Sequence, residues 1–200
     1  MFPAYNSRNC FVAKATLSDF GINATHGAMD KSKSYIGNVN KRWKQFFMGN
    51  YQNLTKKEIQ RGMQMQNLLL EHETGHLLIA ELYARLYKYE VSSFKAIGYG
   101  KTQDEAEKQA KINLITALQK RYAVYNTQLR DMQNRYDTKM EMKTITDYLK
   151  NSTIDSSYDN NIALKQGRQT QVTNALQNML KSNSIENISL FNGAWLDEIK

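Results

Sequence analysis

Residues 55–89 read TKKEIQRGMQMQNLLLEHETGHLLIAELYARLYKY, and this stretch decides the expected architecture. It opens with a capping box, in which the Thr55 hydroxyl accepts a hydrogen bond from the N–H of Glu58 and the Glu58 carboxylate accepts one from the N–H of Thr55. No proline interrupts the stretch, and apolar residues recur at helical spacing. Gly62 and Gly75 are its weak points, each costing about 1 kcal/mol relative to alanine. We therefore predict one long helix over residues 55–89.

The sequence His72-Glu73-Thr74-Gly75-His76 lies inside this helix. Residues four apart lie one turn apart on the same face, so the two imidazoles can bind one metal ion. Glu73 lies about 100° round the helix from His72, so its carboxylate can reach a metal-bound water without being a ligand. Zinc lowers the pKa of a bound water to about 7. Glu73 can take a proton from this water while the water attacks a carbonyl. The pattern predicts a zinc-dependent hydrolase, and it favours a peptidase with Glu73 as general base.

Two histidines can also pack together in a core without a metal. Against that reading, a five-residue pattern with three fixed positions arises by chance in well under about 1% of chains of this length. The chain has only three histidines, and two of them fall in this motif. The motif also lies between leucine-rich segments of a capped helix, where a metalloprotease carries its ligands. The sequence therefore favours a metal site.

A zinc site needs a third protein ligand. Glu81 is near in sequence, but it follows His76 by five residues and so lies roughly 140° away from it round a straight helix. We therefore interpret Glu81 as a structural residue. The remaining candidates are His26, Asp137 and Glu141, and the sequence leaves the choice among them open.

The rest of the chain divides into three parts. Residues 1–51 show glycines between short apolar pieces, which predicts a small antiparallel β region with loops. After a loop over residues 90–101, a second capping box at Thr102-Gln103-Asp104-Glu105 opens a helix to about Tyr136. We expect the two long helices, within residues 55–136, to lie antiparallel. Residues 137–200 have a weaker pattern of helices and loops, with helices expected at 144–150 and 163–180.

Composition and charge limit the possible partners. The net charge is +8, but Lys and Arg are spread along the chain, and the densest cluster, residues 40–47, is typical of a solvated basic face. We therefore expect a peptide or protein substrate rather than nucleic acid. No window approaches 18 consecutive apolar residues, which argues against a membrane span. The N-terminus lacks the apolar run of a signal peptide, and the single Cys10 allows no internal disulfide.

Residues 70–85, LEHETGHLLIAELYAR, resemble the core of a bacterial family of predicted secreted zinc-dependent proteases, whose helix reads roughly HEQGHFDIAELYAR. The segments 102–106 and 133–137 are also similar to it, and 23–27 more loosely. The resemblance covers about residues 23–137 and is specific around the motif. It implies a zinc ion, peptide-bond hydrolysis, and a secreted or periplasmic location, although this sequence shows no signal peptide.

One departure from that family concerns the metal ligands. After the Tyr-Asp pair the family tends to read Glu-Thr-x-His-Gly, whereas Met142 stands here in place of that histidine. If the family histidine is a ligand, Glu141 or His26 has to replace it, or the site is incomplete. The leading expectation is a single α+β domain of zincin type over residues 1–200. The alternative is a catalytically inactive homologue that acts as a binding or scaffold protein.

Overall fold

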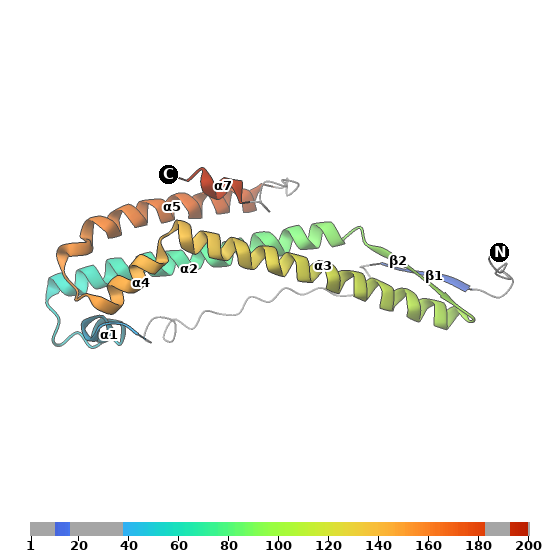
Figure 1. Ribbon diagram of the computed structural model, residues 1–200, viewed down its shortest axis with the longest axis horizontal. Coiled ribbons are helices and arrows are strands. Elements are labelled where there is room, and N and C mark those ends of the chain that lie inside the picture. The colour runs from blue at the N-terminus through green and yellow to red at the C-terminus, as the bar shows by residue number, and fades with distance from the viewer. Residues whose placement is uncertain (1–10, 17–37, 183–192, 200) are drawn as a thin grey trace. The chain divides into compact units, whose positions relative to one another are not determined.

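The computed structural model describes residues 11–16, 38–182 and 193–199. Its elements, in chain order, are β1 (Phe11–Thr16), α1 (Lys41–Phe47), α2 (Lys56–Val91), β2 (Lys95–Gly100), α3 (Gln103–Lys139), α4 (Met142–Asn151), the 3-10 helix η3 (Ser156–Tyr158), α5 (Asp159–Lys181) and α7 (Ala194–Asp197) (Figure 1). The described residues are mostly helical, with a two-stranded antiparallel sheet, so the coarse α+β class is confirmed.

The chain forms two compact units. Residues 1–25 and 83–128 make up the first unit, and residues 26–82 and 129–200 the second. The long helices α2 and α3 each contribute to both units. The prediction of a single domain over residues 1–200 therefore stays a prediction.

In the first unit, β1 pairs antiparallel with β2, with Ala13 opposite Gly98 and Ala15 opposite Ala96. These small residues allow the sheet to lie very close to α3. A Cβ atom at Gly98 would fall 2.1 Å from the backbone oxygen of Ala106, so this position needs glycine. The buried residues of this core are Ala13, Ala15, Ala106, Ala110 and Leu114.

The predicted loop over residues 90–101 is therefore wrong, because it contains β2. Sequence reasoning treated Gly98 and Gly100 as loop residues, whereas both let the strand approach α3. The predicted β region over residues 1–51 is also wrong in part. Among its described residues only β1 is a strand, and its partner comes from beyond the first long helix.

Residues 41–47 of that region form the helix α1. The side chain of Asn40 caps its first turn by accepting a hydrogen bond from the N–H of Arg42, at 3.0 Å. Trp43 and Phe46 lie three residues apart, so they share one face, and both are buried. The cap and this apolar pair favour a helix over a strand.

The capping box at the start of α2 is confirmed. The N–H of Thr55 donates to Oε2 of Glu58 at 2.8 Å, and the N–H of Glu58 donates to Oγ1 of Thr55 at 3.2 Å. The helix runs to Val91, and α3 runs from Gln103 to Lys139, each slightly longer than predicted. Although these helices span 36 and 37 residues, neither they nor the other described helices have a segment apolar enough to cross a membrane.

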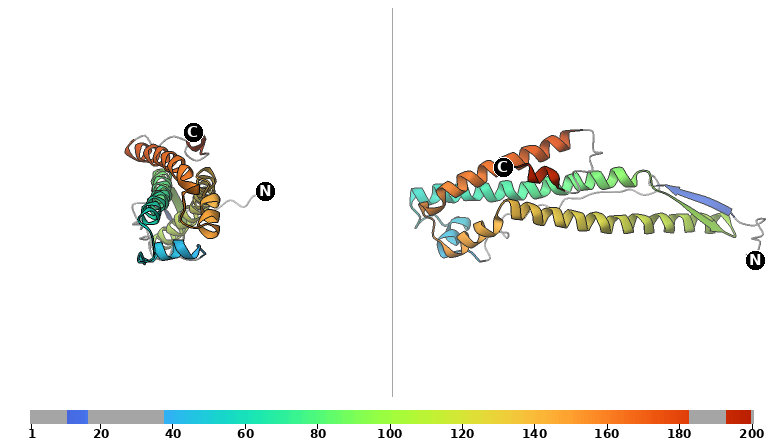
Figure 2. Two further views of the ribbon diagram at one scale, coloured as in Figure 1. Left: turned by 90° about the vertical axis from the view of Figure 1, so that its left-hand side faces the viewer. Right: turned by 45° about the horizontal axis from the view of Figure 1, so that its top comes forward.

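In the second unit, α5 runs parallel to the first part of α2 (Figures 1 and 2). Arg61 of α2 makes a two-pronged ion pair with Asp159 at the start of α5, at 2.8 and 3.0 Å. About three turns of α5 further on, the two helices remain in contact, since Thr170 donates to Glu71 at 3.1 Å. The helices predicted near 144–150 and 163–180 are confirmed as α4 and α5. The buried core contains Trp43, Phe46, Leu54, Met65, Leu68, Leu69, Ile145, Leu149, Ile154, Tyr158 and Ile162.

Candidate metal centre

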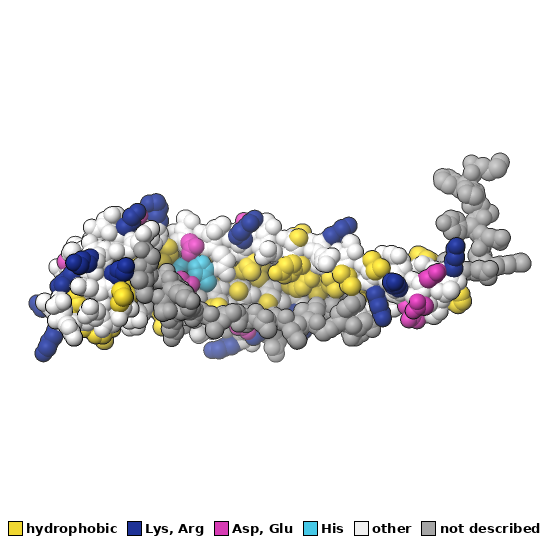
Figure 3. Space-filling view, turned by 90° about the horizontal axis from the view of Figure 1, so that it is seen from below, with side chains coloured by type: hydrophobic (Ala, Val, Ile, Leu, Met, Phe, Trp, Pro, Cys, Tyr) yellow, Lys and Arg dark blue, Asp and Glu magenta, His cyan; other side chains and the backbone are white. Residues whose placement is uncertain are grey.

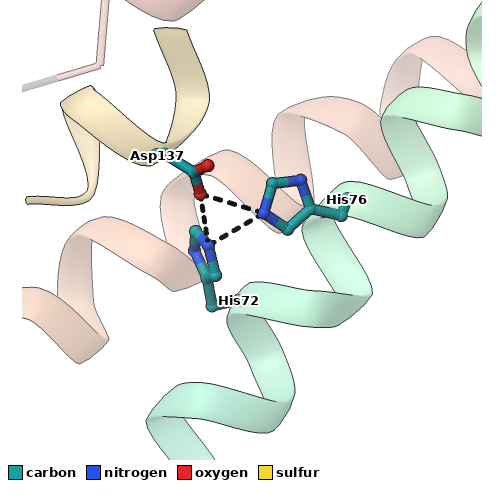
Figure 4. A group of neighbouring side chains, drawn as sticks. All are labelled: His72, His76 and Asp137. Atoms are coloured by element: carbon teal, nitrogen blue, oxygen red, sulfur yellow. Dashed lines mark hydrogen bonds and ion pairs between the residues drawn. The ribbon is translucent and has the colours of Figure 1, made fainter. Parts of the chain in front are cut away.

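Three potential metal ligands meet where α2 faces the end of α3 (Figure 4). Nε2 of His72 lies 2.9 Å from Oδ1 of Asp137, and Nε2 of His76 lies 3.0 Å from the same oxygen. The two Nε2 atoms are themselves 3.0 Å apart. All three residues belong to the second unit. Of the three third-ligand candidates, the structure thus brings Asp137 to the histidines.

The size of this triangle suits a small cation. In a tetrahedral zinc centre with bonds of about 2.0–2.1 Å, neighbouring ligand atoms lie about 3.3 Å apart. The three distances here, 2.9 to 3.0 Å, are slightly shorter than that spacing. A slight separation of the three ligand atoms would give the spacing of a zinc centre.

The protonation state of His76 follows from its second nitrogen. Nδ1 of His76 contacts Oε1 of Gln133, which can only accept a hydrogen bond, so Nδ1 carries the proton. The amide of Gln133 is oriented by a second bond, because its Nε2 donates to the backbone oxygen of His76 at 3.1 Å. In the neutral form of the His76 ring Nε2 has the lone pair, and it faces the carboxylate of Asp137 and Nε2 of His72. A cation between these groups would be attracted by all three.

Gln133 therefore has the role of an outer-shell partner. A histidine that binds a metal usually donates its other N–H to an oxygen, which fixes its tautomer and ring orientation. Gln133 and Asp137 lie one turn apart on α3, and they face His76 and His72, one turn apart on α2. The pairing shows that α2 and α3 are antiparallel in this unit, as predicted.

Tyr136 fixes the other histidine. Its ring stacks on the ring of His72, with centroids 4.6 Å apart and planes at 5°, and its hydroxyl donates to the backbone oxygen of His72 at 3.1 Å. A Cβ atom at Gly75 would fall 2.0 Å from that hydroxyl. The glycine of the motif, which weakens an isolated helix, is thus required here by the close approach of Tyr136.

A buried glutamine of α5 completes this support. Nε2 of Gln169 donates to the hydroxyl of Tyr136, and it also reaches the backbone oxygen of Glu71 at 3.4 Å. Gln169 and Tyr136 are both almost fully buried. Buried polar groups of this kind are stabilising when all of them find partners. The three helices α2, α3 and α5 are therefore connected through the site.

The environment of His72 keeps it neutral. Burial, and then the nearness of His76, lower the pKa of His72 below its ordinary value, and they outweigh the opposing effect of Asp137. A neutral imidazole is the form that binds a metal. Its Nδ1 atom is buried and has no hydrogen-bond partner in the part of the chain that the structure describes. Its Nε2 atom is the one that faces Asp137 and His76.

Glu73 lies next to His72 on α2 and is partly buried. Within residues 11–16, 38–182 and 193–199, its carboxylate has no hydrogen bond or ion pair. It is not one of the three convergent ligands. Its carboxylate is therefore available to accept a proton.

Glu141, another candidate for the third ligand, is paired with other residues. Glu141 precedes α4 with φ of 53°, and its carboxylate pairs with the buried Lys165 and with Arg168. The hydrogen bond and charge of Lys165 lower the pKa of Glu141. Met142, in the place of the resembled family's histidine, packs against the apolar core. His26 lies outside the described residues.

Sequence reasoning did not assign roles to Gln133, Tyr136 or Gln169. Gln133 and Tyr136 belong to the segment 133–137 that resembles the protease family, and their spacing from Asp137 was a usable signal. Gln169 had no such signal, because its partner Tyr136 is 33 positions away. Comparison with family models, with curated proteins and with solved structures finds no match. The functional interpretation therefore rests on the geometry of the site.

Proposed function

We propose that this protein is a zinc-dependent hydrolase of zincin type, acting on peptide bonds. His72, His76 and Asp137 are the metal ligands, and Glu73 is the general base. The observation that supports it most strongly is the convergence of three ligand atoms, all about 3 Å apart, from two helices. Catalytic zinc sites use three protein ligands and keep a further position for water or substrate.

The exposure of the site fits that requirement. The side chain of His72 is buried, whereas that of Asp137 is 45% exposed. In the space-filling view histidine atoms are visible at the surface, with acidic side chains next to them (Figure 3). A substrate carbonyl can approach from this side, while the buried side holds the ligands in place.

Each residue of the site then has its own role in hydrolysis. Zinc, when bound, lowers the pKa of a water molecule to about 7 and polarises the substrate carbonyl. Glu73 accepts a proton from the attacking water, whose oxygen forms a bond to the carbonyl carbon. The C–N bond breaks, and Glu73 passes the proton to the leaving nitrogen. Gln133 and Tyr136 keep the two imidazoles oriented.

Two histidines and one carboxylate also suit iron(II), so the donor set alone does not choose the metal. Glu73 favours zinc, because a carboxylate beside the ligands serves the deprotonation of water. The alternative of an inactive scaffold rested on Met142. Since Asp137 supplies a third donor, the site is not short of a ligand.

The test begins with metal-free protein titrated with zinc. We expect close to one zinc per chain and cleavage within a peptide library, detected by mass spectrometry. The matched variant is Glu73→Gln, which keeps the size and hydrogen bonding of the side chain. It should retain zinc and lose cleavage by orders of magnitude. Zinc binding without any cleavage by the parent protein would instead support the scaffold alternative.

A further inference from the structure

Two leucines lie exposed on α2 on either side of Glu73. Leu70 is 39% exposed and Leu77 is 43% exposed, although leucine is among the residues most often buried. An α-helix turns by about 100° per residue. Viewed down the axis of α2, Leu77 therefore lies about 40°, and Leu70 about 60°, to the same side of Glu73. His76 lies about 60° to the other side. Glu73 is thus between the metal ligands and these leucines, which we call the leucine pair.

The spacing along the helix matches a bound peptide. At about 1.5 Å per residue, Leu70 lies about 4.5 Å from Glu73 along the axis, and Leu77 about 6 Å in the opposite direction. An extended peptide advances about 3.3 Å per residue. A substrate that lies along α2 with its scissile bond near Glu73 therefore brings its first or second side chain on each side to the leucine pair.

The part of α2 that leads up to Leu70 is uncharged, whereas acidic residues (Glu71, Glu73 and Glu81) lie near the leucine pair. Residues 62–70 include no Asp, Glu, Lys or Arg. Met63 continues the apolar stripe one heptad before Leu70 and is 53% exposed. An anionic substrate side chain placed here would lose water and meet acidic neighbours, without gaining an ionic partner.

We propose that Leu70 and Leu77 form apolar subsites that select bulky apolar side chains next to the scissile bond. This inference rests on the proposed function, since it places the substrate by the position of Glu73. In a hydrophobic pocket, one methylene more or less on the substrate changes selectivity by about 10- to 200-fold. Scattered exposed leucines are common on proteins, but these two flank the base within one turn on each side.

The test uses zinc-loaded protein and short peptide hydroxamates, which bind the metal through the hydroxamate. The probes carry leucine, glycine, aspartate or lysine next to that group. We expect the leucine probe to bind about 10-fold more tightly than the others. Leu70→Gln and Leu77→Gln should each reduce that preference at unchanged zinc affinity. The matched control is Leu164→Gln on α5, where the leucine is 73% exposed, and it should keep the full preference.

The outcomes separate this inference from the proposed function. Equal affinities for all four probes would overturn the apolar subsites, and peptide cleavage would still stand as the measure of hydrolase activity. An equal loss of preference in the Leu164→Gln control would also overturn the inference, because the effect would not belong to the leucine pair. A leucine preference without cleavage of any peptide would support the subsites and contradict the hydrolase. Failure to bind zinc would contradict both.

Discussion

The ring of Tyr136 lies parallel to the ring of His72 at 4.6 Å, and the Tyr136 hydroxyl donates to the backbone oxygen of the same histidine. Tyr136 also contacts His76 edge-on, with centroids 4.9 Å apart. One side chain of α3 therefore orients both imidazoles of α2. Because it precedes Asp137 in the sequence, the same turn of α3 supplies both the candidate third ligand and this support.

The first prediction is that Tyr136→Phe weakens zinc binding while keeping the ring contacts. The variant loses the hydrogen bond to His72 and removes one acceptor from the buried amide of Gln169, which should lower the free energy of unfolding by about 1–3 kcal/mol. Zinc affinity should fall by about 10-fold, as for other outer-shell partners. Urea unfolding of the metal-free protein and zinc titration measure the two effects. Parent-like zinc affinity would argue against an orienting role.

The second prediction concerns Gly75. Alanine usually favours a helix over glycine by about 1 kcal/mol, but here its Cβ atom would meet Tyr136. Gly75→Ala should therefore destabilise the protein and weaken zinc binding. The matched control is Gly167→Ala in α5, where a Cβ atom would meet nothing within 4 Å, and this variant should be slightly stabilised. Thermal unfolding of both variants should show shifts of opposite sign, and equal shifts would count against the packing described here.

The third prediction separates the candidate ligands. Asp137→Asn keeps the shape of the side chain and removes its charge. Losing a residue that only orients a ligand lowers metal affinity by about 10- to 100-fold, and we expect Asp137→Asn to lower zinc affinity by more than that. Glu141→Gln should bind zinc like the parent, because Glu141 pairs with Lys165 and Arg168. His26→Ala should also bind zinc normally. If Asp137→Asn binds like the parent and His26→Ala does not, the assigned ligand set is wrong.

The fourth prediction concerns acid stability. The hydrogen bond and charge of Lys165 lower the pKa of Glu141 in the folded protein below its ordinary value of 4.5. The resulting stabilisation is present above that value and is lost as the pH falls through the folded pKa. Glu141→Gln should be less stable than the parent at pH 7, where the buried Lys165 lacks its anionic partner. The two free energies of unfolding, from urea titrations, should converge on acidification below about pH 4.5. A constant difference would contradict this.

The sequence predicted the elements whose signals are local. The capping box of Thr55 and Glu58 gave the start of α2, and the four-residue spacing of His72 and His76 gave the two ligands. It narrowed the third ligand to a short set that includes Asp137. These predictions depend on contacts within one or two turns, or on the chemistry of a motif.

The remaining features depend on contacts between distant residues. From the sequence alone, Gly98 is typical of a loop, and its role depends on the backbone of Ala106, which lies against it. Gly75 would weaken an isolated helix, and its role depends on Tyr136, which fills the space that a Cβ atom would need. Likewise, the sequence of α5 does not distinguish Gln169 from its neighbours, and its role follows from its hydrogen bond to Tyr136. No local pattern encodes these pairs, since each is decided by how separate segments pack.

The most direct test of the metal centre is a crystal structure grown with one equivalent of zinc, with anomalous data collected at the zinc absorption edge. We predict a single strong peak at about 2.0–2.2 Å from Nε2 of His72, Nε2 of His76 and Oδ1 of Asp137. Glu73 should lie outside bonding distance of that peak. A map with no peak at these three atoms, or with zinc bound only elsewhere, would contradict the account.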